Sequence, residues 1–186
     1  MNFFGLSLLA GGFVLSACGG GEPPQPLPPE GTETGRLAPA LFGTSPDGSN
    51  FELERGGGPQ LLVFYRSYDC GLCRVRLERL QQNLPAYRTA GVAVTALTFD
   101  LPVDAGRAAS ELGLGFPVVS IDSAALASYD VLGGRGEVLP ASYLLDERGV
   151  IIFRQVGRNA ADRASDVAIL AALRQTRGEE AGPANY

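Results

Sequence analysis

The chain of 186 residues has no histidine, no tryptophan and only three cysteines. A zinc site needs about four ligands, most often cysteine and histidine side chains. Because these residues are so scarce, a metal site would have to recruit carboxylates, and we expect neither a metal nor another cofactor. The net charge is −5 and no long basic block is present, so nucleic acid is not an expected partner.

Charge is also missing from the first 17 residues, which are mostly apolar and end in Leu15-Ser16-Ala17-Cys18. An apolar stretch of this length before small residues is typical of a signal peptide and is too short to span a membrane. We therefore expect residues 1–17 to be a signal peptide, although the positive residues that usually precede the apolar stretch are absent. A plain secretory peptide, with Cys18 incidental, is the alternative.

The four residues that end this stretch resemble the bacterial lipobox, whose cysteine is acylated and becomes the first residue of a lipoprotein. This resemblance implies lipidation of Cys18 and a lipid bilayer as partner, since several acyl chains give stable attachment. The expected location is extracytoplasmic and membrane-anchored, on the periplasmic side or the cell surface. Only Cys70 and Cys73 would then remain as thiols, which fits an oxidising compartment.

Composition divides the rest of the chain into three parts. Residues 18–36 are rich in proline and glycine, so we expect a disordered tether after the lipidated Cys18. Residues 37–175 have the apolar content of one globular domain, and residues 176–186 are expected to be a disordered tail.

The stretch Leu61–Leu80 is the most informative part of this domain. Residues 61–65 are apolar or aromatic and follow three glycines and a proline, which predicts a buried strand. After it, Cys73, Leu77, Leu80 and Leu84 recur at the spacing of an amphipathic helix. Cys70 is thus predicted at the N-terminus of this helix, and Cys73 one turn later.

That placement favours redox chemistry. Unpaired N–H groups and the helix dipole stabilise a thiolate at a helix N-terminus. Cys70 is therefore the expected nucleophile, and Cys73 can reach a mixed disulfide on Cys70 and release the partner. Arg66 and Arg74 are expected to assist the thiolate and Asp69 to oppose it. Two inert core cysteines, or half of a zinc site, are the alternative interpretations of the spacing.

Further strands and helices are predicted on both sides of this stretch. Pro46–Ser49 is a turn between two short strands, and Asp146–Gly149 joins the strands 141–145 and 150–155 in a hairpin. Other predicted strands cover 92–99 and 117–121; predicted helices cover 100–113, 123–131 with Ser123 as N-cap, and 160–174 with Val167, Leu170 and Ala171 on one face. This order predicts an α/β fold, a mixed central sheet with helices on both faces.

Residues 37–175 resemble proteins with the thioredoxin-like fold, in particular the redoxins of the alkyl hydroperoxide reductase/thiol-specific antioxidant (AhpC/TSA) and TlpA/ResA families. The segments FYRSYDCGLCR and VLPASYLLD carry the resemblance. It implies a cis Leu139–Pro140 bond facing the cysteines, with Pro140 part of the catalytic site and Arg66, Ser67 and Tyr68 supporting it. No carboxylate lies in residues 61–65, so the buried acid of thioredoxins has no counterpart there.

Three functions fit these features of the sequence. The first is a thiol–disulfide oxidoreductase that acts on protein thiols or disulfides and is reset by an unidentified electron donor. The second is a peroxiredoxin-like thiol peroxidase, with Cys70 as peroxidatic and Cys73 as resolving cysteine. Ser67 occupies the Thr/Ser position of the peroxiredoxin motif, but Val63 stands where its proline should be. The third is a non-enzymatic, lipid-anchored binding module, and copper delivery by such relatives uses a histidine that this chain lacks.

Overall fold

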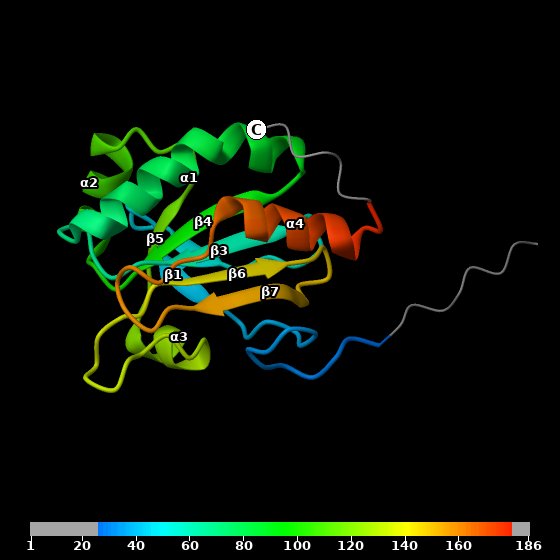
Figure 1. Ribbon diagram of the computed structural model, residues 1–186. Helices are drawn as coiled ribbons and strands as arrows, with labels where there is room; N and C mark the ends of the chain where they lie inside the picture. The colour runs from blue at the N-terminus through cyan, green and yellow to red at the C-terminus, as the bar shows by residue number, and fades with distance from the viewer. Residues whose placement is uncertain (1–25, 180–186) are drawn as a thin grey trace, which may run out of the picture.

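The computed structural model describes residues 26–179, which fold around one mixed sheet in the order β2-β1-β5-β4-β3-β6-β7 (Figure 1). The strands are β1 (Phe42–Thr44), β2 (Asn50–Glu52), β3 (Gln60–Phe64), β4 (Ala93–Thr98), β5 (Val118–Ser120), β6 (Ala141–Leu145) and β7 (Ile151–Val156). Strands β3, β4 and β5 are parallel to one another, and the remaining pairs are antiparallel. The predicted mixed sheet is confirmed, as are both hairpins.

Strand β3 lies inside the sheet, between β4 and β6, and ends at the candidate site. It pairs in parallel with β4, where Phe64 faces Leu97, and antiparallel with β6, where Phe64 faces Ala141. Four of its five residues are buried, as expected for a strand covered on both faces. The chain leaving β3 therefore emerges between the ends of β4 and β6.

Four helices cover the sheet: α1 (Gly71–Thr89), α2 (Pro102–Glu111), α3 (Ser123–Ser128) and α4 (Asp166–Thr176). Figure 1 shows α1, α2 and α4 on one face and α3 on the other. Two apolar clusters fill the corresponding layers. Leu77, Ala105 and Ile169 belong to the first cluster, whereas Leu126 of α3 packs in the second. The predicted arrangement, with helices on both faces, is confirmed.

Helix α1 follows the predicted stripe, since Cys73, Leu77, Leu80 and Leu84 are all buried. Arg76, a charged residue outside this stripe, is also buried. Its guanidinium pairs with Asp166 at the start of α4, with 2.7 Å between Nη1 and Oδ1. This ion pair ties the two helices together on the same face of the sheet.

Two helix predictions need correction. Asp122 is the N-cap of α3, because its side chain accepts a hydrogen bond from the Ala125 N–H, and Ser123 is the first helical residue. Helix α4 begins at Asp166, capped by Ser165, and not near residue 160. Its buried side chains are Ile169 and Leu173. Of the three predicted residues, Leu170 packs against the edge of the first cluster, Ala171 is partly buried and Val167 is exposed. The predicted apolar face therefore overlaps the observed one only at its edge.

The end of the predicted tether is also ordered. The Gly35 N–H donates to the Ile151 carbonyl at 2.8 Å, and the Ile151 N–H donates to the Arg36 carbonyl at 2.9 Å. Thr32 is buried and donates its hydroxyl to Asp130 at 2.5 Å. Residues 29–36 therefore pack against the β6–β7 hairpin, because their backbone groups find partners there that composition does not reveal.

The predicted signal peptide (1–17) and Cys18 lie outside the described residues, as does the predicted tail beyond residue 179. Within residues 26–179, no helix has the length and apolar character that crossing a membrane requires.

Candidate active site

Cys70 is the N-cap of helix α1, as the sequence predicts. Its backbone is extended, with φ −78° and ψ 105°, and its carbonyl accepts hydrogen bonds from Cys73 N (2.8 Å) and Arg74 N (3.1 Å). Its side chain is partly exposed. The sulfur is therefore accessible and lies beside the positive end of the helix dipole.

Cys73 lies one turn further along α1 and is buried, with a relative exposure of 2%. Arg163 reaches it from the loop before α4, and its Nη2 lies 3.6 Å from the Cys73 sulfur. The same guanidinium donates from Nη1 to the carbonyl of Leu72. Neither cysteine is in a disulfide.

The two thiols have opposite electrostatic environments. Burial raises the pKa of Cys70, but hydrogen bonds from the Cys73 side chain and backbone and the charges of Arg163 and Arg66 outweigh it, so the pKa is lowered overall. For Cys73, burial and the hydrogen bond to Cys70 raise the pKa above that of an ordinary thiol. Cys70 is thus the sulfur that ionises first, which suits it to nucleophilic attack.

Both cysteines open into one pocket of about 230 Å³. Three stretches of the chain line this active-site pocket. The first runs from Arg66, in the loop after β3, to Cys73 in the first turn of α1; the others lie within residues 135–140 and 158–163. Pro140 is part of the wall, as the resemblance implied. Cys70, Cys73 and Pro140 therefore border the same pocket.

The Leu139–Pro140 bond is trans, since residues 26–179 contain no cis peptide bond, and the prediction of a cis bond is wrong. The trans isomer is the more stable form of most X-Pro bonds. Here the backbone on both sides is already paired: Leu139 N donates to the Val131 carbonyl, and Gly157 N donates to the Pro140 carbonyl, each at 2.8 Å. The Leu139 N–H is therefore not free to bind an extended substrate.

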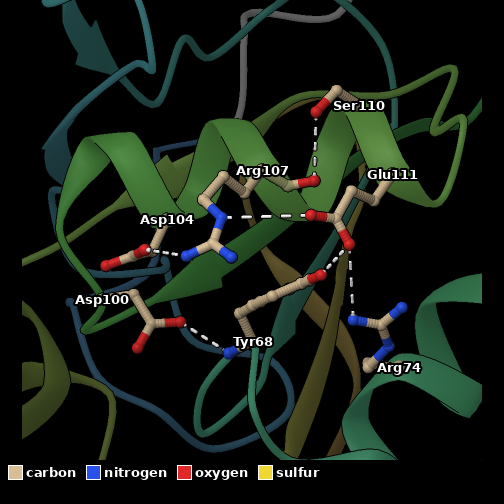
Figure 2. A network of polar contacts seen from close by, with 7 residues as sticks. All are labelled: Tyr68, Arg74, Asp100, Asp104, Arg107, Ser110 and Glu111. Atoms are coloured by element: carbon tan, nitrogen blue, oxygen red, sulfur yellow. Dashed lines mark hydrogen bonds and ion pairs between the residues drawn. The ribbon is translucent and has the colours of Figure 1, made fainter.

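Tyr68 anchors the loop between β3 and Cys70 (Figure 2). Its N–H donates to Asp100 at 2.7 Å, and its hydroxyl donates to Glu111 of α2. The guanidinium groups of Arg74 and Arg107 lie 4.7 and 5.3 Å from the centre of its ring. These contacts fix the backbone two residues before Cys70.

The other predicted supporting residues have different roles. Arg66 lines the pocket and lowers the pKa of Cys70, as expected. Ser67 contributes its carbonyl, which accepts a hydrogen bond from Cys70 N at 3.2 Å. Arg74 was expected to assist the thiolate, but it instead stacks on Tyr68 and pairs with Glu111 at 3.8 Å.

The sequence did not identify the far wall of the pocket. Arg163 and Arg158 were placed in or near the predicted helix 160–174, where nothing distinguished them from surface arginines. Arg135 and Glu137 lie in a glycine-rich stretch without a recognisable motif. Hydrogen bonds from its own backbone N–H and that of Arg135 lower the pKa of Glu137, so this carboxylate is ionised and cannot replace the buried acid of thioredoxins. Among residues 26–179, no group of three or more acidic, cysteine or histidine side chains could hold a metal.

The model of the AhpC/TSA family matches residues 34–154. The chain belongs to the AhpC/TSA family. This AhpC/TSA protein is 25% identical over 136 residues to the thiol-disulfide oxidoreductase ResA of Bacillus thuringiensis (strain Al Hakam), across 72% of the chain and 76% of that relative. ResA of Bacillus anthracis matches with the same values. As a member of this family, the chain is an oxidoreductase.

Solved structures with the same fold are peroxiredoxins and their relatives. A peroxiredoxin-like protein from Aquifex aeolicus has a TM-score of 0.70 at 18% identity, covering 78% of this chain and 88% of that one. Peroxidoxin BcpB from Mycobacterium tuberculosis has a TM-score of 0.68 at 18% identity, covering 77% and 97%. At these identities the likeness shows the fold, and the predicted thioredoxin-like architecture of this AhpC/TSA protein is confirmed.

Proposed function

We propose that the protein is a thiol–disulfide oxidoreductase in which Cys70 attacks and Cys73 resolves. The contrast between the two sulfurs carries the proposal: Cys70 is accessible with a lowered pKa, and Cys73 is buried with a raised one. Both belong to one turn of α1 and one pocket. The resemblance to the ResA proteins, which are thiol-disulfide oxidoreductases, supports it further.

The reaction follows from this arrangement. The Cys70 thiolate attacks one sulfur of a partner disulfide, and the other sulfur leaves as a thiolate that takes up a proton. Cys73 then attacks the Cys70 sulfur, forms the Cys70–Cys73 disulfide and releases the second thiol of the partner. Two electrons pass to the partner, and an external dithiol donor returns the pair to the reduced state.

A thiol peroxidase is the second candidate, favoured by membership of the AhpC/TSA family and by Ser67 three residues before Cys70. Here the Cys70 thiolate would attack a peroxide oxygen, forming a sulfenic acid and releasing water or an alcohol. Cys73 would condense with the sulfenic acid and release water. The same two sulfurs serve both reactions, so activity assays must separate them.

The deciding experiment uses the full-length protein and its Cys73→Ser and Cys70→Ser variants. With a protein disulfide as substrate, we expect the Cys73→Ser variant to accumulate a mixed disulfide through Cys70, and the Cys70→Ser variant to form none. In parallel, hydrogen peroxide and a dithiol reductant are supplied in place of the disulfide. Peroxide consumption without any mixed disulfide would favour the peroxidase, and inactivity in both assays would leave only the binding module.

We further propose that the protein is an extracytoplasmic lipoprotein anchored through Cys18. The support is the sequence of residues 15–18 and the apolar stretch before them. Fatty-acid labelling in a bacterial host should mark the wild-type protein, and Cys18→Ser should abolish both the label and recovery in the membrane fraction. Equal membrane recovery of the unlabelled variant would refute the anchor.

A further inference from the structure

The active-site pocket concentrates positive charge on a protein that is acidic overall. The chain carries a net charge of −5. The pocket is nevertheless lined by four arginines, Arg66, Arg135, Arg158 and Arg163, and by one carboxylate, Glu137. A pocket with mixed polar and apolar walls and convergent charges is a typical small-molecule site.

Two of the four arginines are neutralised by neighbouring carboxylates. Arg135 pairs with Glu137 at 3.6 Å, and Arg158 pairs with Asp162 at 3.0 Å. These pairs leave little net charge at the outer part of the pocket.

Arg66 and Arg163 are different, because neither has a carboxylate within 4.0 Å among residues 26–179. The only hydrogen-bond acceptors of Arg163 in that range are the Leu72 carbonyl and the Cys73 sulfur. Both guanidinium groups also lower the pKa of Cys70. The uncompensated charge therefore lies where the substrate disulfide must bind, and it is available to an anionic ligand.

The remaining wall limits the size and shape of that ligand. Val138, Leu139 and Pro140 supply apolar surface to the pocket, and the volume of about 230 Å³ suits a compact molecule. A small disulfide places apolar methylene groups beside its sulfurs and its polar groups at its ends. With a carboxylate at each end, it offers one anionic group to Arg66 and one to Arg163.

We infer that the pocket selects low-molecular-weight disulfides that carry carboxylate groups. This inference rests on the proposed function and adds its substrate class. The Cys70 thiolate attacks one sulfur of the disulfide and expels a carboxylate-bearing thiol. Cys73 then displaces the second such thiol while the Cys70–Cys73 disulfide forms, and a dithiol reductant, dithiothreitol in the assay, restores the reduced pair.

The test compares three disulfides of similar size and different charge: dithiodiglycolate (anionic), bis(2-hydroxyethyl) disulfide (neutral) and cystamine (cationic). Rate constants are measured for the reduced full-length protein at a pH where Cys70 is fully ionised. Each value is divided by that of dithiothreitol with the same disulfide, which removes differences in intrinsic reactivity. We expect the normalised rate to fall in the order anionic, neutral, cationic.

Single substitutions identify the residues responsible. Arg66→Gln and Arg163→Gln should each lower the anionic-to-neutral rate ratio about threefold to tenfold, the range for one partly screened charge contact. Arg79→Gln is the matched control, because it removes the same charge from an exposed position of α1 that does not line the pocket. Arg66 is itself exposed, so its variant should fold even if the Arg163 variant does not.

The possible outcomes separate the two proposals. Reduction of all three disulfides with equal normalised rates, or an equal effect of Arg79→Gln and Arg66→Gln, would overturn the charge selection and leave the oxidoreductase intact. Failure to reduce even the neutral disulfide would overturn the proposed function, and the inference with it. A charge-ordered rate that Arg66→Gln weakens and Arg79→Gln does not would support both.

Discussion

Substitution of Asp166 by asparagine tests whether a buried ion pair holds helix α4 against α1. Asp166 accepts hydrogen bonds from Arg76 Nη1 and the Tyr87 hydroxyl, both at 2.7 Å, and from Asn83 Nδ2 at 2.8 Å. The side chains of Arg76 and Asp166 are only 8% and 13% exposed. Asp166→Asn keeps the size of the side chain and removes its charge, so the Arg76 guanidinium stays buried without a counter-ion.

The expected loss in the free energy of unfolding is large for the replacement of one carboxylate oxygen by an amide nitrogen. Removing one partner of a buried ion pair destabilises proteins by about 3–5 kcal/mol, because the remaining charge is left uncompensated. The asparagine oxygen can still accept one hydrogen bond, so we expect a loss at the lower end, about 3 kcal/mol. A second nitrogen of Arg76, Nη2, is already buried without a partner among the described residues, which leaves the guanidinium no compensating contact to strengthen.

A matched control is available in helix α2. Asp104 also lies in the first turn of its helix and pairs with an arginine, Arg107, at 3.3 Å. That pair is exposed, with side-chain exposures of 58% and 37% for Arg107 and Asp104. Since both substitutions remove a favourable charge from a helix N-terminus, Asp104→Asn reproduces the dipole effect without the buried partner and should cost about 0–1 kcal/mol.

Equilibrium unfolding in urea gives the free energies of unfolding of Asp166→Asn and Asp104→Asn. Far-ultraviolet circular dichroism follows the transition, because the chain has no tryptophan. Adding Arg76→Met to Asp166→Asn should recover much of the loss, since the orphaned charge is removed with its partner. If Asp166→Asn costs no more than Asp104→Asn, the ion pair does not stabilise the α1–α4 packing and the reasoning is wrong.

Two further predictions concern the cysteines and the wall of the pocket. Alkylation of Cys70 by iodoacetamide should reach half its maximal rate at a lower pH than alkylation of a cysteine in an unstructured peptide, because the Cys70 pKa is lowered. Arg163→Gln should move that midpoint to higher pH. An unchanged midpoint would exclude Arg163 as a cause of the lowered pKa. Gly157→Ala should destabilise the fold by about 1–3 kcal/mol and slow disulfide exchange, because the added Cβ would overlap the Asp162 carbonyl and press on Pro140, as for other overpacked sites. Gly134→Ala, where the Cβ meets open space, should change neither property, and equal effects of the two would count against the close packing at Gly157.

Local sequence patterns predicted the strand and the helix on either side of Cys70 well. The strand before Cys70 and the stripe Cys73, Leu77, Leu80 and Leu84 are both encoded by the spacing of apolar residues, so the N-cap position of Cys70 followed directly. The spacing did not reveal that Arg76 is buried, because its partner Asp166 lies 90 residues away. A charged residue next to an apolar stripe is predicted at the surface unless such a distant partner is known.

The far wall of the pocket could not be predicted from the sequence for a related reason. Residues 158–163 were predicted to lie partly in a helix, but Ser165 caps α4 and leaves them as the loop that brings Arg163 to Cys73. Only the packing of this loop against α1 gives its arginine a role. The backbone pairing of Leu139 with Val131 and of Pro140 with Gly157 also depends on residues that are separated from Pro140 in the sequence.

In the proposed thiol–disulfide exchange, the arrangement of the two sulfurs also explains how attack by Cys73 can follow attack by Cys70. In the reduced pair, burial, the hydrogen bond to Cys70 and the charge of Cys70 all raise the pKa of Cys73, so Cys73 stays protonated while Cys70 attacks. Once the Cys70 sulfur belongs to a mixed disulfide, it carries no charge, and the hydrogen bond from the Cys73 thiol to the Cys70 thiolate is lost. Two of the three causes then vanish, while the Arg163 guanidinium remains 3.6 Å from the Cys73 sulfur. We therefore expect formation of the mixed disulfide to lower the pKa of the Cys73 thiol at the step where its thiolate is required.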